Sequence, residues 1–402
     1  MDTHSQTHAS GCGESEWRGE EGRTPCCGGS PTVDDVAQQP LGGHDATSGV
    51  ASATERLQGV APQPAVSEEK KAAWEADQHR LAQLAAVPRM EIYSDLATGC
   101  EGTAPDDTFV HRWFALPDLE AALTSSSRVD AGECSGKDDH DSAAARRSAT
   151  PNATWEALVR QLRFDKAQQS SAVAAAPPLP ALVYVGGIDI SFVRGTSDGV
   201  ACLTILRYPS MELVGTYMHR CALREPYLSG FLAFREVQPV CELWESVRAE
   251  LLVTQTLPQL LLVDGNGVQH PRRCGLATHL GVVLGIPTIG CTKKLLQVDG
   301  LTRETVEAAL DATTVSPAAH SPTPHLVPLL GATPPRQLYG YAIHGVHNSV
   351  RKCIYVSPGH CIGYAAATAL VLTMLRHRIP EPIRAADLSS RAYIRDAAAS
   401  AD

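Results

Sequence analysis

The chain has 402 residues, of which 44% are hydrophobic, and a formal net charge of −10. This composition is typical of a globular protein, and no apolar run reaches the roughly 18 residues of a membrane-spanning helix. The acidity is confined to one part of the chain: residues 1–180 carry a net charge of −12, whereas residues 181–402 hold 19 Lys and Arg against 17 Asp and Glu. The overall charge therefore does not exclude a nucleic-acid partner for the second part.

Residues 1–66 are rich in Gly, Ser, Thr, Ala and Pro and lack periodicity, so we expect a disordered acidic extension. The first residues have neither an apolar core nor a basic start, which argues against a secretory signal. The 12 cysteines show no CxxC spacing, and we expect them to be reduced thiols. These features predict a location in the cytoplasm or the nucleus.

Regular elements are predicted along the rest of the chain. Helical spacing of Trp74, Leu81 and Leu84 predicts a helix over 68–87, and a second helix is predicted over 155–171. Strands are then predicted over 181–193, 199–209, 211–223, 258–265, 286–291, 338–345 and 352–359. Further helices are predicted over 234–251 with Pro239 in the first turns, over 271–285 with Pro271 at the first position, and over 364–378 as the C-terminal helix. Polar or Pro-rich stretches near 125–152 and 312–336 are predicted to be loop inserts.

The order of these elements predicts the fold class. Three antiparallel strands followed by alternating helices and strands indicate an α/β protein with a mixed sheet flanked by helices. We expect one folded region over 67–402, with its regular core at about 180–396. In an open sheet of this kind, ligands bind at the carboxyl ends of the strands.

Three carboxylates stand out against their surroundings. Asp189 lies inside the strand GGIDIS, Glu236 follows PYLSGFLAFR at the start of a helix, and Asp264 ends the buried run LLLVD. Carboxylates that come together cannot all stay ionised without a cation. Mg²⁺, a hard ion with a preference for oxygen ligands, would satisfy them and could support phosphoryl chemistry.

Each of these residues also has an ordinary structural explanation. A single aspartate at a strand end is more often a cap, Asp189 could pair with a buried arginine, and Glu236 could complement a helix N-terminus. The DGNG loop after the third carboxylate could be an ordinary turn. Taken one by one, the carboxylates do not decide between a metal site and these roles.

The joint pattern resembles the endonuclease V family, and its eukaryotic branch in particular. The motifs that carry the likeness occur in the family's order and are GGIDISFV, PYLSGFLAFRE, LLLVDGNGVQHPRRCGLATHLGVVLGIPTIGCTKKLLQVDG, YVSPGH and RIPEPIRAADLSSR. The resemblance covers about residues 180–396, and residues 74–86 would form the family's N-terminal helix. It implies a ribonuclease H-like fold.

The resemblance implies five catalytic residues. Asp189, Glu236 and Asp264 would hold the metal, which is expected to be Mg²⁺ with Mn²⁺ as an alternative. His360, in the SPGH motif, would lie near the metal and orient water or a phosphate. Lys293 would place a positive charge near the scissile phosphate. The open alternatives are a capping or core role for the histidine and a solvated lysine.

The resemblance also implies a substrate site. Tyr227 belongs to a segment that would wedge beside an extruded base, where an aromatic ring can stack. Bacterial members have Pro-Tyr-Ile-Pro in this segment, whereas Ser229 replaces the second proline here, so the wedge should be less rigid. The residues that match the family's pocket for the flipped base are Leu232, Gly265, His270, Gly275 and Leu276.

The expected function is metal-dependent cleavage of the second phosphodiester 3′ to inosine, with single-stranded RNA favoured. The expected partner is inosine-containing RNA or DNA, with no membrane, and the expected state is a monomer. Two rivals stay open: a deoxyinosine-directed DNA repair endonuclease and a non-cleaving protein that binds inosine-containing RNA. An unrelated metal-dependent phosphatase would share the carboxylates but not the wedge and pocket motifs.

Overall fold

The computed structural model describes residues 66–88, 91–92, 111–126, 153–173, 177–314, 325–344 and 352–400. They belong to one compact unit that spans residues 53–402. The predicted extension, apart from residue 66, lies outside the described residues, and so does the predicted insert near 125–152, apart from residues 125–126. Within the described ranges, no helix combines the length and the apolar character needed to cross a membrane.

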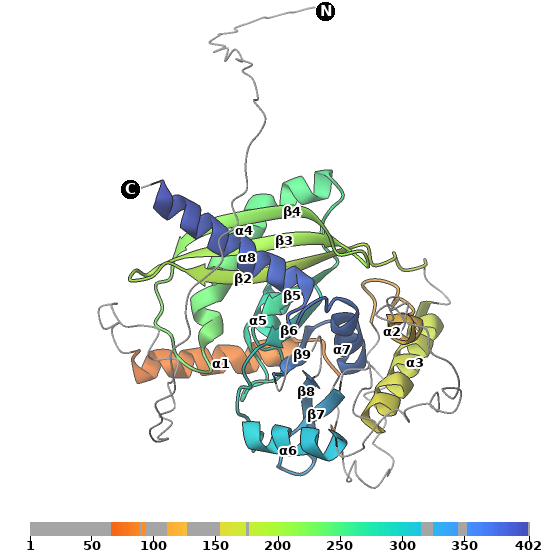
Figure 1. Cartoon of the computed structure of the whole chain (residues 1–402). Helices are drawn as coiled ribbons and strands as arrows, with labels where there is room; N and C mark the ends of the chain where they lie inside the picture. The colour runs from red at the N-terminus through yellow and green to blue at the C-terminus, as the bar shows by residue number, and fades with distance from the viewer. Residues whose placement is uncertain are drawn as a thin grey trace, which may run out of the picture. The chain divides into compact units, whose positions relative to one another are not determined.

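The described strands form a nine-stranded sheet in the order β1-β8-β9-β6-β5-β2-β3-β4, with β7 paired to β8 (Figure 1). Their bounds are β1 Glu91–Ile92, β2 Tyr184–Phe192, β3 Asp198–Arg207, β4 Glu212–Ala222, β5 Leu260–Asp264, β6 Thr288–Thr292, β7 His325–Leu330, β8 Arg336–His344 and β9 Ile354–His360. The helices are α1 Glu68–Leu84, α2 Leu119–Ser126, α3 Ala153–Val173, α4 Leu232–Val253, α5 Leu276–Leu284, α6 Arg303–Thr314, α7 Tyr364–Thr373 and α8 Glu381–Ala399.

The sheet is mixed in the way that the sequence predicts. Strands β2, β3 and β4 form an antiparallel meander, while β5 runs parallel to both β2 and β6. Strand β9 then pairs antiparallel with β6. A meander continued by parallel strands on the far side of its first strand is the ribonuclease H-like arrangement, so the predicted fold class is confirmed.

The central strands are buried on both faces, which explains their continuous apolar runs. Successive side chains of a strand point to opposite faces. In β5, Leu260 and Leu262 accordingly belong to one hydrophobic cluster, and Leu261 and Val263 belong to another. Helices α4 and α5 contribute to the second cluster, and α7 to the first.

Two helices from opposite ends of the described chain, α8 and α1, pack against the sheet and against its covering helices. Helix α8 crosses β2, β3 and β4 on the face opposite α4 (Figure 1). Helix α1 packs against α5, and its Trp74 ring stacks on Phe234 of α4 with centroids 4.8 Å apart. The N-terminal helix is thereby brought next to segments more than 150 residues away along the chain.

Several predicted elements need correction. The helix predicted from Pro271 begins instead at Leu276, because Arg273 takes a left-handed φ of 53° and the segment before it forms a turn in which Arg273 N–H bonds to the His270 carbonyl. Pro239 lies in the interior of α4, beyond its first turn. The predicted helices over 68–87 and 155–171 are confirmed as α1 and α3.

Five elements were not predicted as the structure shows them, and two of these are the short strand β1 and the helix α2. The range 312–336 was predicted to be a loop insert, yet it contains the strand β7, whose apolar residues Leu326 and Leu329 are fully buried. The helix predicted over 364–378 is not the last one, since α8 follows it. Helix α6 also went unpredicted.

Candidate active site

Two of the predicted carboxylates come from neighbouring parallel strands. The register pairs Ile188 of β2 with Val263 of β5, so Asp189 and Asp264 each follow directly after a paired residue at the same level of the sheet. The side chain of Asp189 is buried, and that of Asp264 is half-buried. The sheet therefore holds the two carboxylates side by side on its central strands, at the carboxyl end of β5.

The third carboxylate, Glu236, comes from the second turn of α4 and is only 6% exposed. The charges of Asp189 and Asp264 both act on it. We refer to Asp189, Glu236 and Asp264 together as the carboxylate cluster.

Burial and mutual repulsion both act against ionisation of this cluster. Burial, followed by the charges of Asp264 and Asp387, raises the pKa of Asp189 to about 7. Burial, followed by the charges of Asp189 and Asp264, raises the pKa of Glu236 to about 8. A bound cation would stabilise the ionised form of such a group of buried acids.

Two other side chains bind the cluster directly. Lys293, at the end of β6, places its Nζ 3.0 Å from Asp264 Oδ2. Ser390 of α8 donates a hydrogen bond to Asp189 Oδ2 over 3.5 Å and also contacts Ser191 at 2.7 Å. The structure thus places Lys293 beside the carboxylate cluster, and its role at the scissile phosphate stays a prediction.

The structure adds a fourth carboxylate that sequence reasoning missed. Asp387 of α8 raises the pKa of Asp189 through its charge, and its Oδ1 pairs with Arg391 Nε at 2.7 Å. It lies within the RIPEPIRAADLSSR motif, which was the available signal. Its amphipathic helix has an ordinary composition, so nothing else in the sequence marked it.

The carboxylate cluster has the oxygen donors that a metal ion needs, but its side chains are not arranged as a complete coordination shell. Among the described residues, no three His, Cys, Asp or Glu side chains are already grouped as metal ligands would be. The oxygens of Asp264 and Asp189 instead bind Lys293 and Ser390. The buried carboxylates still repel one another, and oxygen donors held together in this way are what a hard dication binds. The donor set thus fits Mg²⁺ or Mn²⁺.

His360 is the one predicted catalytic residue that the structure does not bring to the cluster. In the antiparallel pairing of β6 and β9 it lies opposite Thr288, at the start of β6, while Asp264 lies opposite Cys291 near the other end. Its Nδ1 accepts a hydrogen bond from the backbone N–H of Ala86 at 3.2 Å. Because β9 runs antiparallel to β6, the end of the SPGH motif points away from the carboxylates.

A cavity of about 80 Å³ lies beside the cluster. We call it the pocket, and its walls are formed by Gln78, Tyr227, Ser229, Gly230, Leu232, Ala233, Asn266, His270, Gly275, Leu276 and Leu296. Four of the five predicted pocket residues are in this wall. The fifth, Gly265, lies directly behind it, since a Cβ there would be 2.9 Å from the Leu276 Cβ.

Close backbone approach shapes two sides of the pocket. Gly230 has a φ of +79°, which other residues rarely adopt. A Cβ on Gly275 would lie 2.2 Å from the carbonyl oxygen of Asn266, so a side chain at this position would push two pocket-lining segments apart. Tyr227 stands at the pocket with 53% of its surface exposed, as a stacking residue would need.

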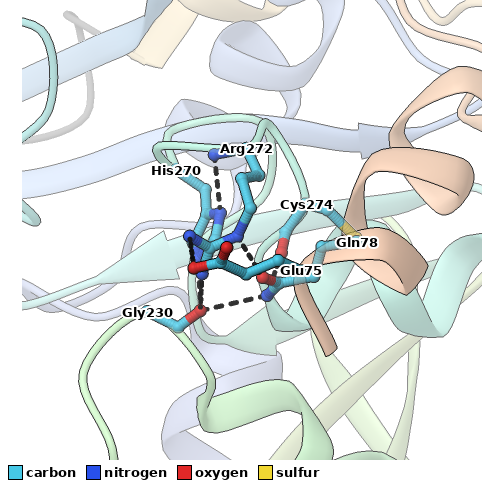
Figure 2. A network of polar contacts seen from close by, with 6 residues as sticks. All are labelled: Glu75, Gln78, Gly230, His270, Arg272 and Cys274. Atoms are coloured by element: carbon cyan, nitrogen blue, oxygen red, sulfur yellow. Dashed lines mark hydrogen bonds and ion pairs between the residues drawn. The ribbon is translucent and has the colours of Figure 1, made fainter. Parts of the chain in front are cut away.

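A network of hydrogen bonds surrounds the Gly230 carbonyl (Figure 2). Its oxygen accepts from Gln78 Nε2 at 3.0 Å, from His270 Nε2 at 2.9 Å and from Arg272 Nη2 at 3.0 Å. His270 Nδ1 accepts from the Arg272 backbone N–H at 3.2 Å, and burial lowers the pKa of this imidazole to about 4. His270 is therefore a neutral ring with its proton on Nε2, and it orients the wall rather than transferring protons.

One polar atom at the pocket has no hydrogen-bond partner among the described residues. Asn266 Oδ1 is buried without a hydrogen bond, although the Asn266 carbonyl accepts from Ala277 N–H. A buried acceptor without a donor costs free energy unless a ligand supplies one. Sequence reasoning took the DGNG loop as backbone geometry and missed this side chain.

The family model described as Endonuclease V matches residues 167–388, which is more than half of the chain. The chain belongs to the endonuclease V family. All five predicted catalytic residues and the five predicted pocket residues lie inside the part that the family model matches. Gln78, in contrast, lies outside it.

Two curated members of the endonuclease V family are similar over about the same part of the chain. Endonuclease V of Mus musculus is 42% identical over 220 residues, which are 54% of this chain and 62% of the mouse protein. Endonuclease V of Homo sapiens is 40% identical over 227 residues, or 54% of this chain and 74% of the human protein. The chain thus spans less than two thirds of the mouse relative.

Solved structures of this family also align with the chain. The crystal structure of human ENDOV has a TM-score of 0.47 at 40% identity and covers 54% of this chain and 86% of its own. The Ciona intestinalis endonuclease V, in complex with a DNA that contains an inosine followed by a ribo-adenosine, has a TM-score of 0.49 at 32% identity and covers 53% of this chain and 87% of its own.

Proposed function

We propose that this chain is a metal-dependent endonuclease that cleaves nucleic acid at the second phosphodiester 3′ to inosine. The products would carry a 3′-hydroxyl and a 5′-phosphate. The observation that carries the proposal is the loop after β5, which begins at the carboxylate cluster with Asp264 and continues into the wall of the pocket with Asn266, His270 and Gly275. One segment therefore sets the spacing between a phosphate-cleaving centre and a base-binding pocket.

The carboxylate cluster would hold the metal through Asp189, Glu236 and Asp264. When bound, Mg²⁺, or Mn²⁺ in its place, supplies positive charge for the attacking and leaving oxygens and for activation of water. The Lys293 Nζ lies 3.0 Å from Asp264 Oδ2. When substrate binds, this ammonium group would leave the carboxylate and place its positive charge beside the substrate phosphate. Asp387 lies close enough to act on Asp189 and adds to the negative field that attracts the cation.

The pocket would receive the base. Hypoxanthine presents an N1–H donor beside its C6 carbonyl, whereas adenine presents an N1 acceptor at the same place. Asn266 Oδ1 has no donor in the part of the chain that the structure describes, so an N1–H would satisfy it and an adenine N1 would leave it unsatisfied. Leu232 and Leu276 would pack against the base plane from the pocket wall.

Single-stranded RNA is the favoured substrate in this proposal. Ser229 stands where bacterial members have a second proline, so the wedge should be less rigid and less able to open a duplex. A single strand needs no such opening. The motifs of the eukaryotic branch point the same way. A DNA repair enzyme acting on deoxyinosine is the alternative, and the inosine-containing DNA bound by the Ciona relative is in keeping with it.

Matched oligonucleotides test the proposal. The same sequence is offered as single-stranded RNA with one inosine, as single-stranded DNA with one deoxyinosine, and as both strands with adenine in its place. We expect Mg²⁺-dependent cleavage at the second phosphodiester 3′ to inosine and faster cleavage of the RNA. Equal cleavage of the adenine strands would contradict inosine recognition. Tight binding of the inosine strands without cleavage would instead identify a non-cleaving reader.

A further inference from the structure

The pocket has an outer wall that comes from the N-terminal helix α1, about 90 residues before the part of the chain that the family model matches. Gln78 of α1 lines the pocket and is fully buried, at 0% exposure. A fully buried glutamine is uncommon, and it persists only where its carboxamide finds partners.

The Gln78 carboxamide finds those partners on two separate segments (Figure 2). Its Nε2 donates to the Gly230 carbonyl at 3.0 Å and to the Cys274 carbonyl at 3.1 Å. Gly230 ends the segment that carries Tyr227, and Cys274 precedes the pocket residue Gly275. A single NH₂ group therefore ties together the wedge segment and the loop after β5.

Arg272 fixes the orientation of this carboxamide. Its Nε donates to Gln78 Oε1 at 2.5 Å, its Nη2 to the Gly230 carbonyl at 3.0 Å, and its Nη1 to Glu75 Oε1 at 3.2 Å. Its guanidinium also lies over the Phe231 ring, 4.4 Å from the centroid. With a donor on Oε1, the amide cannot flip without facing its NH₂ toward the guanidinium and its oxygen toward two carbonyls.

We propose that Gln78 is a positioning residue that sets the width of the pocket and thereby the preference for inosine; this rests on the proposed function. The Gly230 carbonyl has two lone pairs and three donors around it, so its direction is set before any ligand arrives. Because the walls of the pocket are already held at a fixed spacing, binding of a base does not carry the entropic cost of ordering them. Loss of the tie should therefore reduce base selection without reducing contacts to the phosphate backbone.

The test measures binding rather than cleavage, in EDTA, with three single-stranded RNAs that carry inosine, adenosine or an abasic site at one position. The full chain is compared with Gln78→Leu and with Gln78→Glu, which keeps the side-chain volume and the acceptor for Arg272 but loses both donors. The matched control is Gln83→Leu, the same chemical change at an exposed position of the same helix. Thermal unfolding of each variant is recorded in parallel.

We expect both Gln78 variants to lose about tenfold or more of the affinity ratio between inosine and adenosine RNA, because the two hydrogen bonds that tie the pocket walls together are removed and the walls must then be ordered by the base itself. Affinity for the abasic RNA should stay within twofold of the wild type, and Gln83→Leu should behave as the wild type throughout.

Three results would overturn the proposal. They are an unchanged affinity ratio in folded Gln78 variants, an equal loss of affinity for all three RNAs, and unfolding of both variants, which would make Gln78 a stability residue. If the wild type itself does not prefer inosine, the proposed function fails, and this outcome is separate because it needs no variant.

Discussion

The carboxylate cluster and the pocket share one loop, yet their polar groups are in opposite states. In the cluster, buried like charges raise the pKa of Asp189 to about 7 and that of Glu236 to about 8. In the pocket wall, the Gly230 carbonyl accepts three hydrogen bonds and the carboxamide of Gln78 is bound at both ends. The cluster is poorly neutralised by the protein itself. In the pocket wall, by contrast, the Gly230 carbonyl and the Gln78 carboxamide are fully paired, and Asn266 Oδ1 is left open to a ligand.

This difference suggests that the cluster binds the metal and the pocket selects the base. A site whose charges repel one another gains most of its stability from the ion it binds. A site whose walls are already hydrogen-bonded gains its selectivity from the geometry that it holds beforehand. The predictions below separate the two: changes at the cluster should affect catalysis and the response to metal, and changes at the pocket should affect the choice of base or strand.

The largest effect is expected from removing a charge from the cluster. Asp189→Asn and Asp264→Asn should each lower the rate of Mg²⁺-dependent cleavage on the order of a thousandfold or more, since metal-ion stabilisation contributes several kcal/mol to such reactions. RNA affinity should change little, because phosphate contacts elsewhere supply most of the binding. Cleavage near the wild-type rate in either variant would refute the site assignment. His360→Ala serves as a comparison, since the structure separates His360 from the cluster, and we expect a much smaller loss.

A smaller but more selective effect is expected from the wedge. Tyr227→Ala should slow cleavage of an inosine-containing duplex more than cleavage of the matching single strand. Stacking on an aromatic ring contributes on the order of 1–3 kcal/mol per base, and only the duplex adds the cost of unpairing. Rates on both substrates are measured for Tyr227→Ala and for Tyr227→Phe, which keeps the ring and should behave as the wild type. Equal losses on the two substrates would remove the wedge role.

The electrostatic demand of the cluster predicts a pH effect on stability. The pKa of Asp189 is raised to about 7 and that of Glu236 to about 8, so from about pH 4.5 up to these values the folded protein holds protons that the unfolded chain has lost. The metal-free protein should therefore lose stability as pH rises from 6.5 to 8.5, by at most on the order of 1.4 kcal/mol per pH unit for each group. The buried histidines His111, His270 and His279, whose pKa values burial lowers to about 4, act in the opposite direction, because the unfolded chain still protonates them partly near pH 6.5. They offset the loss at the lower end of the window and contribute little at its upper end.

Thermal unfolding with and without Mg²⁺ measures this effect. The melting temperature without metal should fall by a few degrees across the window, and Mg²⁺ should raise it more at pH 8.5 than at pH 6.5. Asp189→Asn should flatten the metal-free profile. A metal-free melting temperature that rises with pH would show that the cluster is not under this repulsion.

The smallest effect is expected from the acidic extension. Deleting residues 1–66 should leave the preference for inosine unchanged, because every described pocket residue lies after them. If the extension repels nucleic acid, the deletion should also tighten RNA binding at low salt, and the gain should shrink as salt screens the charges. Equilibrium binding at several salt concentrations measures this. Loss of folding or of cleavage would show that the domain boundary is misplaced.

The parts of the fold that the sequence predicted are those with strong local patterns. The continuous apolar runs of β2 and β5 predicted buried strands, and Asp189 and Asp264 were conspicuous because strands disfavour aspartate. The start of α5 was misplaced because Pro271 suits a first helical position, whereas the left-handed φ of Arg273 depends on the surrounding loop. Strand β7 was missed because its flanks are rich in Pro, Ala, Thr and Ser.

The parts of the site that the sequence did not predict depend on contacts across the chain. Gln78 is an ordinary residue for a helix, and its role follows only from bonds to Gly230 and Cys274 far along the chain. Asp387 becomes part of the site only because α8 crosses β2. His360 was placed near the metal by its motif, and the antiparallel direction of β9 places it elsewhere.

The central claim is that the carboxylate cluster binds the catalytic cation, and anomalous diffraction from Mn²⁺-containing crystals tests it most directly. We predict a Mn²⁺ peak within about 2.5 Å of oxygens from Asp189, Glu236 and Asp264, with Lys293 moved away from Asp264. The same crystals of Asp264→Asn should show a weaker peak or none. No peak at the cluster, at a Mn²⁺ concentration that supports cleavage in solution, would contradict the account, and so would a peak bound only by other residues.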